Sequence, residues 1–331
     1  MKTASINIKI GGRAGEGVKI TGQILAKTLT RLGWSTFSHQ EYPSLIRGGH
    51  NTFQIHACAS KAYSQIFKVN LLLAFDQNTL DFHQRELDEN SLIVYDPKIC
   101  RADERMVGNY LPLPLTEIAA ENKNPLMANS VALGAAFGLL SLDLKQLNLI
   151  FDQIYGDKGK DVAAANKKSC RQGFERCRKI YAKKQIKIQK PKKRVKRMMI
   201  TGNEAAALGA ISSGLKFFSA YPMTPATSIL HYLAEKEKVC QMAVKQPEDE
   251  IAAVNGAIGA SFMGARALTA TSGGGFCLMI EGLGLSGVSE TPLVIINSMR
   301  PGPASVSLSG AKDRRLSPCA EMLTVIEGSF T

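Results

Sequence analysis

The sequence lacks the cysteine and histidine patterns that hold metal ions. Its seven cysteines are scattered, and no two of them stand in a Cys-x-x-Cys arrangement. This spacing argues against an iron–sulfur cluster or a structural zinc held by this chain alone. The five histidines are equally dispersed. We therefore expect no metal site on this chain and cysteines that remain reduced thiols.

Long hydrophobic runs are also missing. No uninterrupted apolar stretch reaches the roughly 18 residues that a membrane helix needs. The first residues lack the apolar core of a secretory signal. Both absences predict a cytoplasmic protein that does not associate with membranes.

Acidic residues are absent from one stretch that carries nearly all of the net charge of +13. Residues 176–197 contain twelve basic side chains, and since 13 minus 12 leaves 1, the rest of the chain is almost neutral. No aromatic platform or recognised nucleic-acid-binding fold accompanies them. A solvated helix end and linker containing Pro191 explain the stretch more simply than binding of nucleic acid, and contact with an acidic partner subunit stays open. The basic residues are Arg176, Arg178, Lys179, Lys183, Lys184, Lys187, Lys190, Lys192, Lys193, Arg194, Lys196 and Arg197.

The length of 331 residues predicts about two domains, and the first half alternates between strand and helix patterns. Ile6, Ile8 and Ile10 alternate with polar residues, a glycine-rich segment follows at 11–17, and apolar residues recur at helical spacing between 20 and 32. Residues 70–75 and 92–95 are further strand candidates, and residues 128–155 and 161–184 are predicted helices. This order indicates an α/β fold with a mostly parallel sheet covered on both faces.

Two loops of the first half are candidate anion sites. Gly12, Gly15 and Gly17 precede a helix, where backbone N–H groups suit a phosphate. Their spacing fits neither the dinucleotide fingerprint nor the P-loop, so a tight structural turn is an equal alternative. Arg47 lies beside two glycines in the loop-like segment 42–49. It is placed to hold a phosphate or carboxylate, or to make a surface turn or subunit contact.

The second half begins with a small-residue helix at 202–210 and a strand at 217–220. The sequence Tyr-Pro-Met-Thr-Pro then occupies residues 221–225, and its two prolines fix the backbone so that Thr224 is presented at a strand end. Ligands of open α/β sheets usually bind at this edge. A plain loop that enters the next helix explains the prolines equally well.

An acidic segment at 247–250 opens another helix of small residues. Acids are ordinary in a first helical turn, whereas small residues allow a backbone or a flat ligand to approach closely. Residues 267–271 are a predicted strand, Ser272 and Gly273 follow it, a helix begins near Phe276, and residues 292–297 are another strand.

The first half resembles the gamma domain of 2-oxoacid:ferredoxin oxidoreductases over about residues 5–180. The resemblance is carried by residues 11–17, Gln-Ile-Leu-Ala at 23–26, the segment 42–49 and Phe-Asp-Gln at 75–77. It implies that Gly12, Gly15, Gly17 and Arg47 serve either coenzyme A or an assembly interface.

The second half resembles the pyrimidine-binding domain of thiamine diphosphate enzymes. The Tyr-Pro-x-Thr-Pro loop, the glutamate before Ala-Ala and the Thr-Ser-Gly-Gly-Gly strand end point to the alpha subunit of the same oxidoreductases, most closely the 2-oxoglutarate type. We therefore expect a gamma domain at 1–180, a basic linker at 181–197, a pyrimidine-binding thiamine-fold domain at 198–303 and a divergent tail at 304–331.

The resemblance implies oxidative decarboxylation of a 2-oxoacid to an acyl-coenzyme A, with electrons passing to ferredoxin. It implies that Glu250 is catalytic through a hydrogen bond to the aminopyrimidine ring, and that Thr224 contacts a substrate oxygen. The cofactor-binding residues implied are Tyr221, Pro222, Ser272 and Gly273. Pyruvate and branched 2-oxoacids share these motifs with 2-oxoglutarate.

The same resemblance implies partners. The sequence contains no Gly-Asp-Gly motif, which holds the magnesium ion of thiamine diphosphate in this superfamily. We therefore expect the cofactor to be shared with a beta subunit, which would also carry the Mg²⁺ and an iron–sulfur cluster, with ferredoxin as the electron acceptor.

The sequence departs from the family pattern after Pro303, where a Thr-Gly-x-Pro-Thr segment is replaced by residues 304–310. An abrupt change of this kind is what a shifted reading frame produces, and it predicts a truncated alpha subunit whose tail is poorly ordered. Two alternatives follow: a non-catalytic fragment of such a subunit, and a dinucleotide-binding oxidoreductase, which the glycine spacing disfavours.

Overall fold

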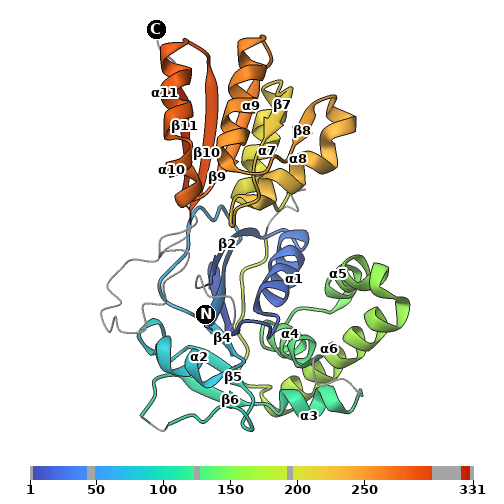
Figure 1. The fold of residues 1–331 in the computed structure, drawn as a ribbon. Helices are drawn as coiled ribbons and strands as arrows, with labels where there is room; N and C mark the ends of the chain where they lie inside the picture. Colours follow the sequence, from blue (N-terminus) through green and yellow to red (C-terminus); the bar gives the residue numbers. More distant parts are fainter. Residues whose placement is uncertain are drawn as a thin grey trace. The chain divides into compact units, whose positions relative to one another are not determined.

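The computed structural model describes residues 3–42, 49–103, 105–122, 127–191, 197–299 and 322–328, the last range by its backbone alone. The chain divides into two compact units, Met1–Met199 (unit 1) and Ile200–Thr331 (unit 2). Each unit packs helices against its own sheet, which confirms the α/β class (Figure 1). Among the described residues, no helix combines the length and the apolar character needed to cross a membrane.

In the described part of unit 1, six strands form one mixed sheet of order β2-β3-β1-β4-β5-β6. β1, β4, β5 and β6 are parallel, whereas β3 is antiparallel to both β1 and β2. The expectation of a mostly parallel sheet is therefore wrong on the β2–β3 side. Phe53, Ile55 and Ala57 of β3 alternate with polar residues, as in a half-buried strand, whereas β2 contains a single apolar residue, Phe37. The strands are β1 (Ser5–Arg13), β2 (Ser35–Glu41), β3 (His50–Cys58), β4 (Leu71–Ala74), β5 (Leu92–Tyr95) and β6 (Asn109–Pro112).

Among the described residues, five helices pack on one face of this sheet, and the short α2 packs on the other face near β1 and β4, because successive strand residues point to opposite sides. Leu71 and Leu73 of β4 join the larger core beneath α1, α3, α4, α5 and α6, while Leu72 and Ala74 join a smaller core with α2. The helices are α1 (Val18–Arg31), α2 (Gln77–Phe82), η1 (Gln84–Glu86), α3 (Leu115–Ala120), α4 (Ala128–Leu139), α5 (Lys145–Tyr155), η3 (Gly156–Lys158) and α6 (Lys160–Ile180).

The predicted helix at 128–155 is two helices. α4 ends at Leu139, Ser141 adopts a left-handed φ of 53°, and α5 begins at Lys145. The side chain of Asp143 accepts a hydrogen bond from the Lys145 backbone N–H at 2.8 Å. A residue with a left-handed backbone cannot continue a helix. The apolar pattern of the sequence continues across this break between α4 and α5 and therefore did not reveal it.

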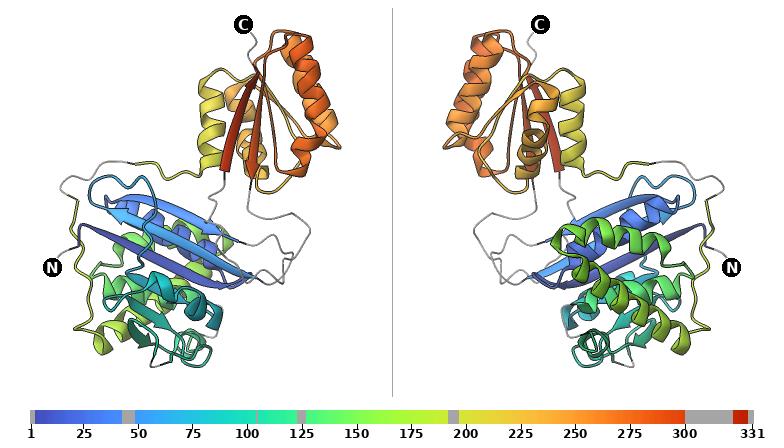
Figure 2. Two further views of the ribbon diagram at one scale, coloured as in Figure 1. Left: turned by 90° about the vertical axis from the view of Figure 1, so that its left-hand side faces the viewer. Right: turned by 90° about the vertical axis from the view of Figure 1, so that its right-hand side faces the viewer.

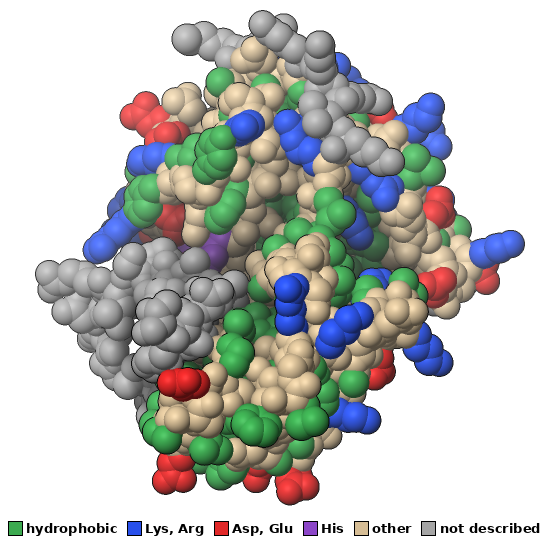
Figure 3. Space-filling view, turned by 90° about the horizontal axis from the view of Figure 1, so that it is seen from above, with side chains coloured by type: hydrophobic (Ala, Val, Ile, Leu, Met, Phe, Trp, Pro, Cys, Tyr) green, Lys and Arg blue, Asp and Glu red, His purple; other side chains and the backbone are tan. Residues whose placement is uncertain are grey.

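The basic linker expected at 181–197 is in part packed on unit 1. Ile188 is buried in the larger core, and Trp34 Nε1 donates a hydrogen bond to the Gln189 carbonyl at 3.1 Å. Arg197 donates to the Gly33 carbonyl at 2.7 Å. The expectation of a solvated linker is therefore wrong for these residues, because their apolar and backbone groups find partners in unit 1. On the face drawn in Figure 3, Lys and Arg side chains are scattered among acidic and hydrophobic ones.

Five strands within the described residues of unit 2 form a sheet of order β11-β10-β9-β7-β8. β8, β7, β9 and β10 are parallel, and β11 is antiparallel to β10. Parallel strands end at the same edge, so the loops after β7 and β9 lie next to each other. The strands are β7 (Phe217–Ser219), β8 (Ala243–Lys245), β9 (Ala267–Thr271), β10 (Leu293–Met299) and β11 (Met322–Gly328).

Helices lie on both faces of this second sheet (Figure 2). Leu268, Ala270 and Ile296 pack with α7 and α8, while Leu293 and Ile295 pack with α9 and the segment that joins α10 to α11. The helices are α7 (Gly202–Ser212), α8 (Thr227–Cys240), α9 (Glu250–Phe262), α10 (Gly274–Leu278) and α11 (Ile280–Val288).

Met322–Gly328 of the expected tail pair with β10 as β11. Met299 pairs with Met322 and Leu293 with Gly328. The edge of β10 presents backbone donors and acceptors, and residues 322–328 include the β-branched residues that favour strands. Residues 304–321 and 329–331 of the expected tail lie outside the described residues.

Candidate functional site

The glycine loop of unit 1 is shorter than the sequence predicted. β1 continues through Gly12 to Arg13, because these residues pair with Asn51 and His50 of β3. A Cβ atom at Gly12 would lie 2.7 Å from Glu16 Oε2 and 3.0 Å from Phe75 Cβ. Gly12 is therefore required by close packing inside the strand end.

Gly15 and Gly17 form the turn that enters α1. Their φ angles are 95° and 74°, in the left-handed region where glycine is favoured. Asn129 Nδ2 donates to the Glu16 carbonyl at 2.9 Å, and a Cβ atom at Gly17 would overlap that same nitrogen. Close packing accounts for Gly12 and Gly17, and the left-handed backbone accounts for Gly15, while a ligand role for the three glycines stays a prediction.

The charges beside this loop include two carboxylates. Arg13 Nε lies 3.7 Å from Glu16 Oε1 and 3.9 Å from Asp76 Oδ2. Burial raises the pKa of Glu16, although the hydrogen bond from the Arg13 backbone opposes this. Arg47, the other predicted anion-binding residue, lies outside the described residues.

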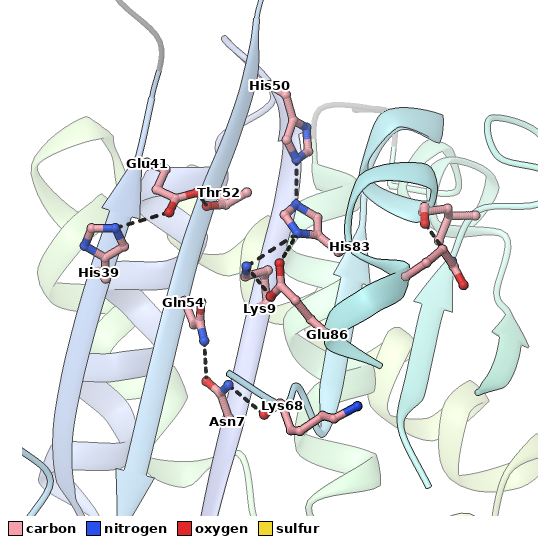
Figure 4. Close-up of polar contacts among 12 residues, drawn as sticks. Asn7, Lys9, His39, Glu41, His50, Thr52, Gln54, Lys68, His83 and Glu86 are labelled. Carbon is pink, nitrogen blue, oxygen red and sulfur yellow. Dashed lines mark hydrogen bonds and ion pairs between the residues drawn. The ribbon is translucent and has the colours of Figure 1, made fainter. Parts of the chain in front are cut away.

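A buried ionic cluster on β1, β3 and the segment after α2 was not foreseen from the sequence (Figure 4). Lys9, only 4% exposed, pairs with Glu86. His83 Nδ1 lies 2.6 Å from Glu86 Oε1, and His83 Nε2 lies 2.9 Å from His50 Nε2. Burial alone would raise the pKa of Glu86, but the His83 hydrogen bond and the Lys9 charge bring the pKa below its ordinary value. The pairing neutralises two charges taken out of water and ties η1 to β1.

A second pair lies nearby on β2 and β3. His39 Nε2 is 3.4 Å from Glu41 Oε1, and Thr52 Oγ1 donates to Glu41 Oε2 at 3.3 Å (Figure 4). The interaction with His39 lowers the pKa of Glu41 to about 2. In the described part of the chain, no group of three or more metal-ligating side chains is placed to hold a metal ion.

The predicted site residues of unit 2 gather at the carboxyl edge of its sheet. Tyr221 and Pro222 follow β7, and Thr224 is exposed in the same loop. Ser272 and Gly273 follow β9, the parallel neighbour of β7. Thr271 Oγ1 lies 3.9 Å from Met223 Sδ, so a side chain from each segment meets at this edge.

Glu250 is the first residue of α9 and is 5% exposed. Its neighbour Asp249 caps the helix by accepting a hydrogen bond from the Ala252 backbone N–H at 2.7 Å. Among the described residues, no hydrogen bond or ion pair engages the Glu250 carboxylate. Since Asp249 already caps the helix end, Glu250 is not needed for that purpose.

Gly275 lies against Glu250 and was not singled out from the sequence. A Cβ atom there would lie 2.5 Å from Glu250 Oε1 and would overlap Thr271 Oγ1. The neighbouring Gly273 has a φ of 43° and precedes α10. The signal available in the sequence was the run of three glycines after Ser272, one of which had to permit a close approach.

Comparison with known proteins identifies both units. Residues 7–176 match the family described as "Pyruvate ferredoxin/flavodoxin oxidoreductase". Residues 208–314 match "Pyruvate flavodoxin/ferredoxin oxidoreductase, thiamine diP-bdg", so a thiamine diphosphate-binding domain is present and the likeness extends past Pro303. The expected order of a gamma-type domain followed by a thiamine diphosphate-binding domain is confirmed.

Three relatives illustrate the similarity. A 2-oxoacid:ferredoxin oxidoreductase subunit alpha from Sulfolobus sp is 28% identical over 89% of this chain and 54% of its own length. A 2-oxoglutarate synthase subunit KorA from Archaeoglobus fulgidus is 50% identical over 32% of this chain and 31% of its own. The 2-oxoglutarate:ferredoxin oxidoreductase structure from Magnetococcus marinus is 31% identical, with a TM-score of 0.83 over 91% of this chain and 53% of that chain. The chain thus spans about half the length of the Sulfolobus subunit and the Magnetococcus chain.

We predict that Glu86→Gln lowers the free energy of unfolding by about 3–5 kcal/mol at pH 7, because it leaves the Lys9 ammonium buried without its charged partner. Since the pKa of Glu86 is lowered by folding, its stabilisation is present above the ordinary pKa of 4.5 and is lost as the pH falls below it. Urea unfolding measured from pH 7 to pH 3 tests both statements.

Glu175→Gln in the exposed Arg171–Glu175 pair is the control, expected to cost under about 0.5 kcal/mol. Equal losses for both variants would contradict the burial of Lys9.

We predict that Gly275→Ala destabilises unit 2 by about 1–3 kcal/mol, because the added methyl group meets Glu250 and Thr271. Gly274→Ala is a matched control, since nothing lies within 4 Å of its Cβ position. Its stability should be unchanged or slightly higher. Calorimetric melting of the two variants decides, and an equally stable Gly275→Ala would argue against the close approach.

Proposed function

The chain belongs to the pyruvate ferredoxin/flavodoxin oxidoreductase family, and we propose that it acts as the alpha subunit of a 2-oxoacid:ferredoxin oxidoreductase. The reaction is the oxidative decarboxylation of a 2-oxoacid to an acyl-coenzyme A, with electrons passed to ferredoxin. The observation that carries the proposal is the nearly buried Glu250 carboxylate, which has no hydrogen-bond or ion-pair partner among the described residues and lies at the sheet edge where ligands bind.

The residues of unit 2 fit the pyrimidine end of thiamine diphosphate. The Glu250 side chain is nearly enclosed, yet its oxygens are not among the fully buried polar atoms that lack a partner, so a ligand N–H or ring nitrogen can reach them. Gly275 has no side chain that could crowd Glu250 Oε1, since a Cβ atom there would lie 2.5 Å from this oxygen. When bound, thiamine diphosphate supplies the carbon nucleophile that attacks the 2-oxo group.

Glu250 holds or releases a proton at its carboxylate facing the ring nitrogen, which is general acid–base work. Thr224 presents its hydroxyl to a carboxylate or oxo oxygen of the substrate from the exposed loop after β7. Tyr221 and Pro222 form the start of that loop. Ser272 and Gly273, at the end of β9, line the cofactor side of the site.

The partner subunit completes the site in this proposal. It provides the Mg²⁺ that holds the diphosphate, since this sequence has no Gly-Asp-Gly motif, and it carries the iron–sulfur cluster that passes electrons to ferredoxin. The loop with Gly12, Gly15 and Gly17, together with Arg47, serves coenzyme A or the subunit interface.

Among 2-oxoacids we propose 2-oxoglutarate. The 2-oxoglutarate synthase subunit of Archaeoglobus fulgidus reaches 50% identity over its matched region, and the Magnetococcus marinus enzyme was solved with 2-oxoglutarate, coenzyme A and succinyl-CoA bound. Pyruvate and branched 2-oxoacids are the competing substrates in the assay below.

We predict that Glu250→Gln, in the enzyme assembled with its partner subunit, lowers turnover by about 100-fold to 10,000-fold while the fold is kept. Glutamine preserves the size of the side chain and its ability to accept a hydrogen bond, but it cannot carry the proton. Reduction of ferredoxin or a viologen dye that depends on the 2-oxoacid measures the rate.

The control is Glu248→Gln, since Glu248 is exposed two residues earlier and should matter little. Circular dichroism checks that both variants are folded. Turnover by Glu250→Gln equal to that of the parent enzyme would reject the catalytic role.

A further inference from the structure

Asn203 is a buried amide that joins three segments at the ligand-binding edge of unit 2. It is the second residue of α7, after the Thr201 capping box, and it is 5% exposed. Its Nδ2 donates to the Pro225 carbonyl at 3.0 Å and to Ser228 Oγ at 2.8 Å. Its Oδ1 accepts a hydrogen bond from Ser298 Oγ at 3.1 Å.

These three bonds use both donors of the amide and its oxygen. Pro225 directly follows Thr224, Ser228 lies in the first turn of α8, and Ser298 lies near the end of β10. The helix start is already capped by the Thr201 side chain and Glu204. Asn203 is thus not needed to begin α7, and its side chain is directed to the loop that carries Thr224.

We propose that Asn203 is a positioning residue that sets the place of Thr224 relative to the end of β10. This inference rests on the proposed function, in which Thr224 contacts the 2-oxoacid. The Asn203 amide holds the Pro225 carbonyl, and Ser298 holds the Asn203 amide. The Pro225 carbonyl therefore cannot shift without leaving polar groups unpaired. The loop is therefore preorganised for the substrate oxygen before the substrate arrives.

The test variant is Asn203→Asp in the enzyme assembled with its partner subunit. Aspartate has the same shape and still accepts from Ser298, but it places an oxygen where the NH₂ group donated to Pro225 and Ser228. The KM for 2-oxoglutarate is expected to rise about tenfold, equivalent to about 1.4 kcal/mol. The KM for coenzyme A is expected to stay the same, because the loop faces the 2-oxoacid.

A merely structural role gives a different result. A variant that is only less stable lowers the amount of active enzyme, so the apparent kcat falls and the KM for the 2-oxoacid does not change. Ser261→Ala is the matched control, since Ser261 is buried and donates to the carbonyl of Pro292, at the opposite end of β10. It should alter stability without altering either KM.

A double variant tests whether Asn203 acts through Thr224. If it does, adding Asn203→Asp to Thr224→Val leaves the KM of Thr224→Val unchanged, whereas independent effects multiply. Ser298→Ala is a milder second variant in case Asn203→Asp does not fold. It frees Asn203 from β10 and is expected to raise the KM for 2-oxoglutarate about threefold, in the range of one weakened hydrogen bond.

The outcomes separate the two proposals. A parent enzyme that turns over no 2-oxoacid overturns the proposed function, and the role of Asn203 with it. An active parent whose Asn203→Asp and Ser298→Ala variants keep the parental KM for 2-oxoglutarate overturns the positioning role alone. Multiplied effects in the double variant with Thr224→Val also overturn it.

Discussion

The close approach of Gly275 to Glu250 and Thr271 is the contact on which the site of unit 2 depends. It brings the start of α10 against the first residue of α9 and the end of β9. A side chain at position 275 would occupy the space beside the Glu250 carboxylate. Because β9 and β7 are parallel neighbours, the same edge also receives the loop with Thr224. The narrow packing thus buries a carboxylate beside a loop of exposed polar groups.

The Lys9 cluster of unit 1 and Glu250 of unit 2 differ in the partners of their charged groups. In unit 1, Lys9, Glu86 and His83 satisfy one another, so their burial ties η1 to β1 without requiring a ligand. In unit 2, the described residues give the Glu250 carboxylate no such partner. The Glu250 oxygens are not among the fully buried polar atoms that lack a partner, so they remain open to a ligand. This contrast favours a structural interpretation of the first cluster and a ligand-binding interpretation of Glu250.

Local patterns predicted the elements that have clear periods. The strand with Ile6, Ile8 and Ile10 was found from alternation, and the strand at Leu92–Tyr95 from a short continuous apolar run. The helix that ends at Ile180 was found from helical spacing. β2 was missed because Phe37 is its only apolar residue, whereas β3 was overlooked although Phe53, Ile55 and Ala57 alternate with polar residues along it. β11 was missed because strand pairing with β10 depends on a distant segment, which no local pattern records.

The sequence by itself determined the order of the two α/β units, the family motifs and the residue types of the candidate site. Tertiary structure decided which of these residues meet. Glu250 and Gly275 are separated by a helix and a strand, and Asn203 and Ser298 lie 95 positions apart. Their contacts arise from the register of parallel strands and the packing of helices on the sheet. The strand register and the helix packing depend on all residues of the core together, so they cannot be derived from any one segment of the sequence.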